Sequence, residues 1–590
     1  MSATLFLDTI EIEVDALEAI AFEINGDNNK TSAFPYPLLK KSGKDSQISL
    51  RIAVLQNEEI EATLALDLGG RIIKLLDRRT GLFTFNLPPN IRLTDGGPRG
   101  VFWNHGIEFA CGPNHLRLNG LGPVEFHCIE QENPDEDRAE IILHEMMAGT
   151  EISWHTRISL AKNSCWLNID TRIINRSSET DLETNTGIRI FNNDLLPGTV
   201  SNLDNSTFWH QKSPDDQAGI IVRFPQNEFD TISNSELGSA LSQNLTGQNP
   251  LFARNTQSVS YAICPSPNFS SNPIFFANGV IGIKDNDLIG RSFESEGKVK
   301  LSLGWENSFM AANWDTQSNR LLSVSGLNNL LPEDSNLPKN IKVSGQDFVE
   351  MSAEFTLPEQ LSDALKITHL TTEDFANSPL ARTRMGSKRN SGHWLLACEA
   401  LKSGDIAGAN RSLDDALNYA GDDHFVWWLK AALLRLQLDV DQEMPERPEL
   451  LNAHFLAPLE PLLRVEAFLS INNNFDKEPS SVLKPIGNHI DALCDIACLL
   501  LETGLLVDAA RFLDEALRHS DHSNLRYLMA NLLLQRPNMK MEAAQHISVC
   551  EIKPIEAPLP WRRLEIKAIL ELAEQFPSSA KLQKLAKLYK

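Results

Sequence analysis

The sequence predicts a multidomain chain of the β-then-α class, a large antiparallel β-sandwich followed by an all-α domain of helical repeats. From about residue 46 to residue 360, apolar residues recur at every second position, as in strands with one buried face. After about residue 390 they recur with helical spacing, and two stretches there share one pattern at identical offsets. We therefore expect an N-terminal extension or strand (1–45), the sandwich (46–360), a linker (361–390) and the repeat domain (391–590).

Length, composition and charge bound the classes of function. A chain of 590 residues exceeds the roughly 250–300 residues at which single cores stop growing, so several domains are expected. The net charge of −24 would repel phosphate backbones and anionic lipids, so we do not expect nucleic acid to be a partner. The sequence shows neither a signal peptide nor an apolar run of about 18–20 residues, so we expect a cytoplasmic protein without a membrane partner. Eight scattered cysteines fit reduced thiols.

The sandwich is predicted from alternation within individual strands. Apolar residues alternate with polar ones over 152–160 and again over 167–173, and the polar turn at 162–164 joins the two runs. This pattern is typical of a β-hairpin. Many short strands of this kind, separated by loops rich in Asn, Ser, Pro and Gly, predict an antiparallel sandwich.

The helical half is predicted from an internal repeat. Gly404 precedes the sequence LDDAL at 413–417, and Gly504 precedes LDEAL at 513–517 with the same offset. Each copy is flanked by helical segments rich in Trp, Leu and Ala, and the arrangement resembles the tetratricopeptide repeat. We expect this domain to bind a protein partner or to form a homodimer.

Residues suited to chemistry are densest between Leu66 and His127. A double glycine precedes Arg71, and the segments 103–109 (WNHGIEF) and 112–115 (GPNH) follow. Together they supply an aromatic plate, hydrogen-bonding amides and titratable groups, the mixture that a sugar site needs. The sequence therefore predicts a carbohydrate site in this region.

Several of these segments resemble a known family. They are the Phe34-Pro35-Tyr36-Pro37 segment, the Gly69-Gly70-Arg71-Ile72 turn with Asp77, Thr80 and Gly81 after it, and the 103–109 segment with His115 beyond it. They are similar to a large bacterial domain family of uncharacterised function in the galactose-mutarotase-like superfamily, often followed by tetratricopeptide repeats. The resemblance covers about the first 350 residues and is strongest over 35–127. It implies a β-supersandwich that binds carbohydrate in a groove on its concave sheet.

The expected chemistry is cleavage or transfer of a glycoside or oligosaccharide by paired acidic residues. One carboxyl group protonates the departing oxygen and a second acts as base or nucleophile. The expected catalytic residues are Glu108, Glu306 and His115. The expected substrate-binding residues are Arg71, Trp103, His105, Asn114 and Trp305.

Each assignment has a structural alternative. Glu108 could bond a loop amide, Arg71 could pair with Asp67 or Asp77, the histidines could be core groups, and the tryptophans could fill the core. Two other functions stay open, an aldose 1-epimerase-like mutarotase and a non-catalytic carbohydrate sensor or scaffold. No metal or cofactor is expected, because His105 and His115 lack a third ligand and the sequence holds no phosphate-binding or dinucleotide motif.

Overall fold

The computed structural model describes most of the chain. The described residues are 2–20, 34–109, 117, 120–129, 137–147, 149–178, 180–191, 198–203, 206–212, 218–225, 231–235, 238–245, 250–267, 269, 273–276, 279–284, 287–293, 298–305, 308–315, 321–324, 340–345, 353–356, 389–419, 421–437, 447–469, 483, 486 and 489–589.

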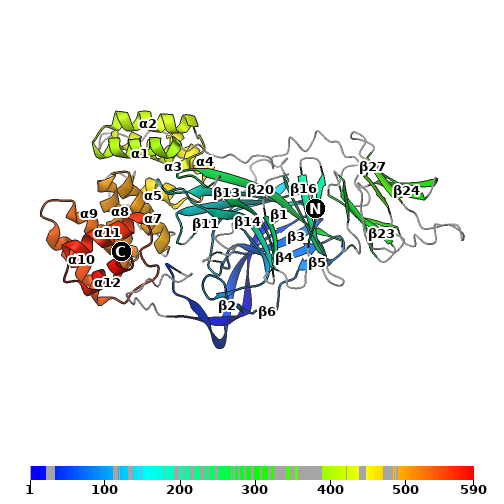
Figure 1. The fold of residues 1–590 in the computed structure, drawn as a ribbon, viewed down its shortest axis with the longest axis horizontal. Coiled ribbons are helices and arrows are strands. Elements are labelled where there is room, and N and C mark those ends of the chain that lie inside the picture. The colour runs from blue at the N-terminus through cyan, green and yellow to red at the C-terminus, as the bar shows by residue number, and fades with distance from the viewer. Residues whose placement is uncertain are drawn as a thin grey trace.

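Two large sheets dominate the first half of the chain (Figure 1). In spatial order, the ten-stranded sheet contains β18 (Thr231–Ser235), β19 (Gly238–Leu245), β14 (Thr184–Phe191), β9 (Gly106–Phe109), β4 (Arg71–Asp77), β3 (Ile60–Ala65), β2 (Leu39–Gln56), β1 (Thr4–Ala19) and β6 (Asn90–Ile91), with β5 (Leu82–Phe85) also on β4. The eight-stranded sheet contains β10 (Glu125–Cys128), β11 (Arg138–Met147), β12 (Ile152–Ala161), β13 (Leu167–Asn175), β20 (Thr256–Ser266), β17 (Gly219–Pro225), β16 (Ser206–Gln211) and β15 (Thr199–Leu203). Apart from the parallel pair β1–β6, the recorded pairings within these two sheets are antiparallel.

The two sheets pack face to face around one apolar core. Leu64, Ile72 and Ile107 of the ten-stranded sheet join Leu143 and Trp154 of the eight-stranded sheet in this core, and all five are fully buried. Because successive strand residues point to opposite faces, the neighbours of these residues lie on the outer faces. The predicted hairpin is present as β12 and β13, which pair from Ile152↔Asn175 to Leu160↔Leu167.

A second apolar cluster covers the outer face of the ten-stranded sheet. Strand residues such as Ile52 and Ile73 pack there against Leu93, Val101 and Trp103 from the segment between β6 and β9. This segment includes the two-stranded sheet of β7 (Thr94–Asp95) and β8 (Val101–Phe102). The outer face is therefore covered by chain at this point.

Two four-stranded sheets lie at the end of the molecule far from the helices (Figure 1). One contains β21 (Ile274–Phe276), β22 (Gly279–Lys284), β23 (Asp287–Ser292) and β26 (Leu321–Val324). The other contains β25 (Ser308–Asp315), β24 (Lys298–Trp305), β27 (Asn340–Gly345) and β28 (Ala353–Thr356).

The second half of the chain is helical. Its described helices are α1 (Arg389–Lys402), α2 (Ile406–Tyr419), α3 (His424–Gln437), α4 (Pro448–Leu456), α5 (Pro461–Leu469), α7 (Ile490–Glu502), α8 (Leu506–His519), α9 (Ser523–Leu534), α10 (Lys540–Ile552), α11 (Arg563–Gln575) and α12 (Ala580–Lys587). Among the described residues, none of these helices combines the length and the apolar character needed to cross a membrane.

The internal repeat corresponds to equivalent helical turns. Gly404 ends the α1–α2 turn at φ 80° and Gly504 ends the α7–α8 turn at φ 79°, a conformation that glycine adopts without steric cost. Leu413 and Leu513, which follow at the same offset, are both fully buried in the helical core. The shared spacing therefore reflects a repeated helix–turn–helix unit.

The helical domain packs directly on the sandwich near β11 and β13 (Figure 1). Ile174 of β13 belongs to the helical core, and Arg172 donates to the carbonyl of Leu456 at 2.9 Å. The Phe34–Pro37 segment takes part as well, because the Pro35 carbonyl accepts from the amide of Leu559 at 2.9 Å. This motif of the family resemblance therefore lies at the junction of the two domains.

The predicted fold class, an antiparallel β-sandwich followed by an all-α domain, is confirmed. Two of the predicted domain limits can be compared with the bounds of the observed elements. The limit between 45 and 46 falls inside β2, whose long hairpin with β1 joins the N-terminal segment to the ten-stranded sheet. The first helix begins at Arg389, and most of the predicted linker lies outside the described residues.

Candidate functional site

The double glycine sets the geometry at the start of β4. Gly69 and Gly70 both have positive φ, at 73° and 67°. A Cβ on Gly69 would lie 2.6 Å from Nη2 of Arg117, and a Cβ on Gly70 would lie 2.8 Å from Cδ1 of Leu143. Because side chains fit at neither position, the turn requires glycine, and it places Arg71 as the first residue of the strand.

Arg71 is buried on the outer face of the ten-stranded sheet. Its guanidinium donates to the carbonyls of Trp103 at 2.7 Å and Gly120 at 3.2 Å, and to Oε2 of Glu108 at 3.3 Å. The same group lies over the rings of Trp103 and Phe191, 5.5 and 5.3 Å from their centroids. Arg71 thus holds together segments that are distant in the chain.

Glu108 lies at the centre of a buried charge network. Its neighbours in β9, Ile107 and Phe109, face the sandwich core, so alternation directs Glu108 to the outer face. The side chain is only 2% exposed and accepts from both Arg71 and Nε of Arg117, the latter at 3.0 Å. Arg117 in turn pairs with Glu145 of β11. Glu108 is therefore an ion-pair partner of two arginines.

The alternative partners considered for Arg71 are engaged elsewhere. Asp67 accepts from Nε of Arg51 at 2.9 Å, and Asp77 pairs with the buried Arg291. The acid that pairs with Arg71 is Glu108, which is distant in sequence. A local reading of the turn could not identify it.

Trp103 and His105 pack on one another above the outer face. Their ring centroids are 5.3 Å apart with an interplanar angle of 27°, and Trp103 is only 3% exposed. His105 is partly exposed, and its Nε2 contacts the carbonyl oxygen of Ile73 at 2.9 Å. Burial is the main cause that lowers the pKa of His105, so its imidazole is neutral at pH 7. Within this group, His105 reaches the surface while Trp103 is covered.

The structure brings together half of the predicted site residues. Arg71, Trp103, His105 and Glu108 form one cluster, described above. Trp305 ends β24 in a four-stranded sheet, apart from the ten-stranded sheet. Asn114, His115 and Glu306 lie outside the described residues.

Sequence reasoning missed three charged residues of the cluster. They are Arg117 and Glu145, already described, and Arg189, which is directly opposite Glu108 in β14 and 5% exposed. The position of Arg189 between Ile188 and Ile190 is a usable signal, since a charge between two buried residues occupies the other face of the strand. Arg117 follows no periodic pattern that would have identified it.

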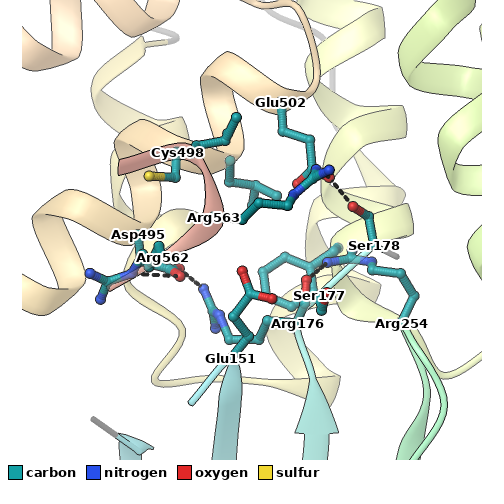
Figure 2. Close-up of a pocket in the computed structure, with 13 residues that line it drawn as sticks. Glu151, Arg176, Ser177, Ser178, Arg254, Asp495, Cys498, Glu502, Arg562 and Arg563 are labelled. Atoms are coloured by element: carbon teal, nitrogen blue, oxygen red, sulfur yellow. Dashed lines mark hydrogen bonds and ion pairs between the residues drawn. The ribbon is translucent and has the colours of Figure 1, made fainter. Parts of the chain in front are cut away.

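A pocket lies between the sandwich and the helices (Figure 2). Arg176 and Glu151 approach from the sandwich, while Asp495, Glu502 and Arg562 approach from the helical domain. Arg176 and Asp495 form an ion pair, and Nε of Arg562 lies 3.6 Å from Asp495. The cavity measures about 40 Å³, which is room for a few waters and too little for a sugar ring. The pocket is therefore best described as a polar domain junction.

Burial shapes the electrostatics of this junction. It raises the pKa of Glu151, with the charges of Asp495 and Glu502 adding to the effect. Arg176 is 5% exposed and is neutralised by Glu460 at 2.7 Å as well as by Asp495. Elsewhere along the same junction, the described residues also include a group that could hold a metal ion, formed by His144, His155 and Glu460.

One known protein family matches part of the chain. The model of a family described as a domain of unknown function (DUF5107) matches residues 28–181, which include the cluster of Arg71 and Glu108. No curated protein matches the chain.

Two solved structures show limited similarity. A TPR-domain containing protein from Parabacteroides distasonis is 14% identical, covering 98% of this chain and 91% of its own length, at a TM-score of 0.32. A galactose mutarotase-like protein from Clostridium acetobutylicum is 10% identical, covering 37% of this chain and 94% of its own length, at a TM-score of 0.24.

Proposed function

We propose that the sandwich binds a carbohydrate beside the partly exposed His105, on the segment that covers the outer face of the ten-stranded sheet, and that the protein acts there on a glycoside or oligosaccharide by hydrolysis or transglycosylation. The observation that supports this proposal is the buried network of Arg71, Arg117, Glu108 and Glu145 next to the partly exposed His105. Buried ion pairs are often no more stabilising than apolar packing. Networks of this kind concentrate at functional sites.

The geometry suggests a division of roles. Arg71 and Glu108 act as positioning residues, because Arg71 holds the backbone carbonyls on both sides of Asn104, at 2.7 and 3.3 Å. His105 offers the sugar the exposed part of its ring, because its Nε2 is already bonded to the carbonyl oxygen of Ile73. Proton transfer falls to His115, a residue that the sequence predicts to be catalytic.

A non-catalytic carbohydrate sensor is the second candidate. It is favoured by the burial of Glu108, because a carboxylate with 2% exposure and two arginine partners is poorly placed to reach a glycosidic oxygen. In this case the helical repeats would dock a protein partner or a second copy of the chain. A mutarotase would instead act on free reducing sugars.

The experiment compares chemistry with binding in one preparation. The full chain is incubated with a panel of disaccharides, oligosaccharides and free aldoses while reducing ends, transfer products and optical rotation are followed. Release of reducing ends or formation of transfer products supports the proposed enzyme, and faster mutarotation alone supports the epimerase alternative. Saturable binding without turnover supports the sensor, and the absence of both binding and turnover rejects the carbohydrate proposal.

Matched variants assign the activity to this face of the sheet. His105→Gln should reduce turnover or binding at least tenfold. His127→Gln, which alters an exposed histidine at the edge of the other sheet, should leave both unchanged. Equal activity of the two variants would place the site elsewhere.

A further inference from the structure

A group of histidines is buried where the eight-stranded sheet meets the helices. His144 of β11 and His155 of β12 are directly opposite one another, with ring centroids 4.4 Å apart. Their strand neighbours Leu143 and Trp154 face the sandwich core, so both histidines face the helical domain. The two imidazoles are 2% and 5% exposed.

The helical domain supplies a carboxylate to the same place. Glu460, immediately before α5, is fully buried, and its ligand atom lies within 4.8 Å of those of His144 and His155, which also lie within 4.8 Å of each other. His424, the first residue of α3, places Nε2 3.4 Å from Oε2 of Glu460. Three potential metal ligands therefore converge from both domains, with a fourth polar ring beside them.

The polar atoms of the two rings have no partners within the protein. Neither Nδ1 nor Nε2 of His144 or of His155 makes a hydrogen bond. A neutral imidazole carries one donor and one acceptor, and burying both unpaired is unfavourable. A bound ion would satisfy one nitrogen of each ring.

We propose that His144, His155 and Glu460 bind a divalent transition metal of the zinc class, and that the ion fastens the helical domain to the sandwich. Two imidazoles and one carboxylate suit Zn²⁺ or Co²⁺ better than Mg²⁺ or Ca²⁺, which prefer all-oxygen sites. Ligands of a tetrahedral zinc ion lie about 3.4 Å apart, given bonds of about 2.1 Å. From separations within 4.8 Å, pairs of ligand atoms would approach each other by up to about 1.4 Å to reach this geometry.

The surrounding charges are compatible with an ion. Glu460 accepts from Arg176 at 2.7 and 3.2 Å, and a carboxylate has further lone pairs for a metal. Arg172 donates to backbone carbonyls of the helical domain, and Arg464 lies 3.7 Å from Glu125. Glu125 is directly opposite His144 in β10, so water or this carboxylate can take the fourth position. Because the site is closed, the ion has a structural role.

No metal site is expected from the sequence alone. That expectation considered His105 and His115, which lie close together in the chain. The ligands named here come from a strand pair and from a loop of the other domain, so no local spacing predicts them. The proposal is independent of the carbohydrate function.

Metal binding by the full chain tests the proposal. The protein is stripped with a chelator, titrated with Zn²⁺ or Co²⁺, and followed by metal analysis, cobalt absorption and thermal unfolding. We expect one equivalent to bind, tetrahedral-type cobalt absorption and a higher midpoint of unfolding, with Mg²⁺ having no such effect. Failure to retain an equivalent of either metal would overturn the proposal.

Variants locate the bound ion. His155→Gln and Glu460→Gln should each weaken zinc affinity at least tenfold and abolish the cobalt spectrum. His210→Gln, which alters a buried histidine of β16 in the same sheet, should preserve both. If the Glu460 variant fails to fold, His155→Gln alone decides the result. Unchanged affinity in His155→Gln, or equal loss in His210→Gln, would overturn the assignment.

Discussion

The replacement Glu108→Gln tests the buried charge network most sharply. It keeps the shape of the side chain and removes the charge that faces Arg71 and Arg117. The amide would turn its NH₂ group toward one guanidinium, so a hydrogen bond between donor and acceptor would become a contact between two donors.

The expected loss in the free energy of unfolding depends on the partners that Arg71 and Arg117 retain in the variant. Removing one partner of a buried ion pair costs about 3–5 kcal/mol. Arg117 retains Glu145, and Arg71 retains the carbonyls of Trp103 and Gly120, so we expect the lower end, about 3 kcal/mol.

Urea unfolding of the full chain measures this loss. Tryptophan fluorescence follows unfolding of the whole chain, because buried tryptophans lie both in the sandwich (Trp154) and in the helical domain (Trp428), and unfolding is compared with that of Glu13→Gln. Glu13 pairs with Arg92 at the surface, where both side chains are more than a third exposed, so its replacement should cost about 0–1 kcal/mol. Equal losses in the two variants, both below about 1 kcal/mol, would refute the reasoning about the buried network.

Three further predictions concern stability. Gly404→Ala and Gly504→Ala should each cost about 1–2 kcal/mol of stability, because both glycines have positive φ. Gly504→Ala should cost more, since its Cβ would lie 2.7 Å from Cγ of Lys402, whereas a Cβ on Gly404 has no neighbour within 4 Å. Equal losses of stability in urea unfolding would contradict this prediction. Trp428→Ala should cost about 3–5 kcal/mol of stability, because its side chain is fully buried. Trp427→Ala removes a partly exposed ring and should cost less than half as much. A larger loss in Trp427→Ala than in Trp428→Ala, in the same assay, would contradict this prediction. Burial lowers the pKa of His210 from 6.5 to about 3, so the unfolded chain takes up the proton first as pH falls, and stability is lost below about pH 6.5. Between pH 7 and pH 5 the His210→Gln variant should lose about 2 kcal/mol less than the natural chain, and identical pH profiles would contradict the assignment.

Local pattern was sufficient to predict the architecture. Period-two alternation in β12 and β13 identifies the apolar face that each strand turns to the sandwich core, and the equal offsets after Gly404 and Gly504 identify a repeated helical turn. These features depend on neighbours a few residues apart. The order of the two domains, a β-sandwich followed by an all-α domain, could therefore be predicted without tertiary information.

The candidate site was predictable only in part. Alternation correctly directed Glu108 away from the sandwich core. Its burial depends on Arg117 and on the chain around Trp103, which covers the outer face through contacts that no periodic pattern encodes. The contacts at the junction with the helices are harder still to predict, because Arg176 pairs with Glu460, a residue of the other domain that is far away in the sequence.

Saturable sugar binding by the purified full chain tests the central claim most directly. A titration calorimetry panel of oligosaccharides and free sugars, repeated with His105→Gln and His127→Gln, separates binding beside the outer-face cluster from binding elsewhere. The account predicts at least one saturable ligand, whose affinity falls tenfold or more in His105→Gln and is unchanged in His127→Gln. Absence of saturable binding across the panel, or equal affinity of both variants for the ligand, would contradict it.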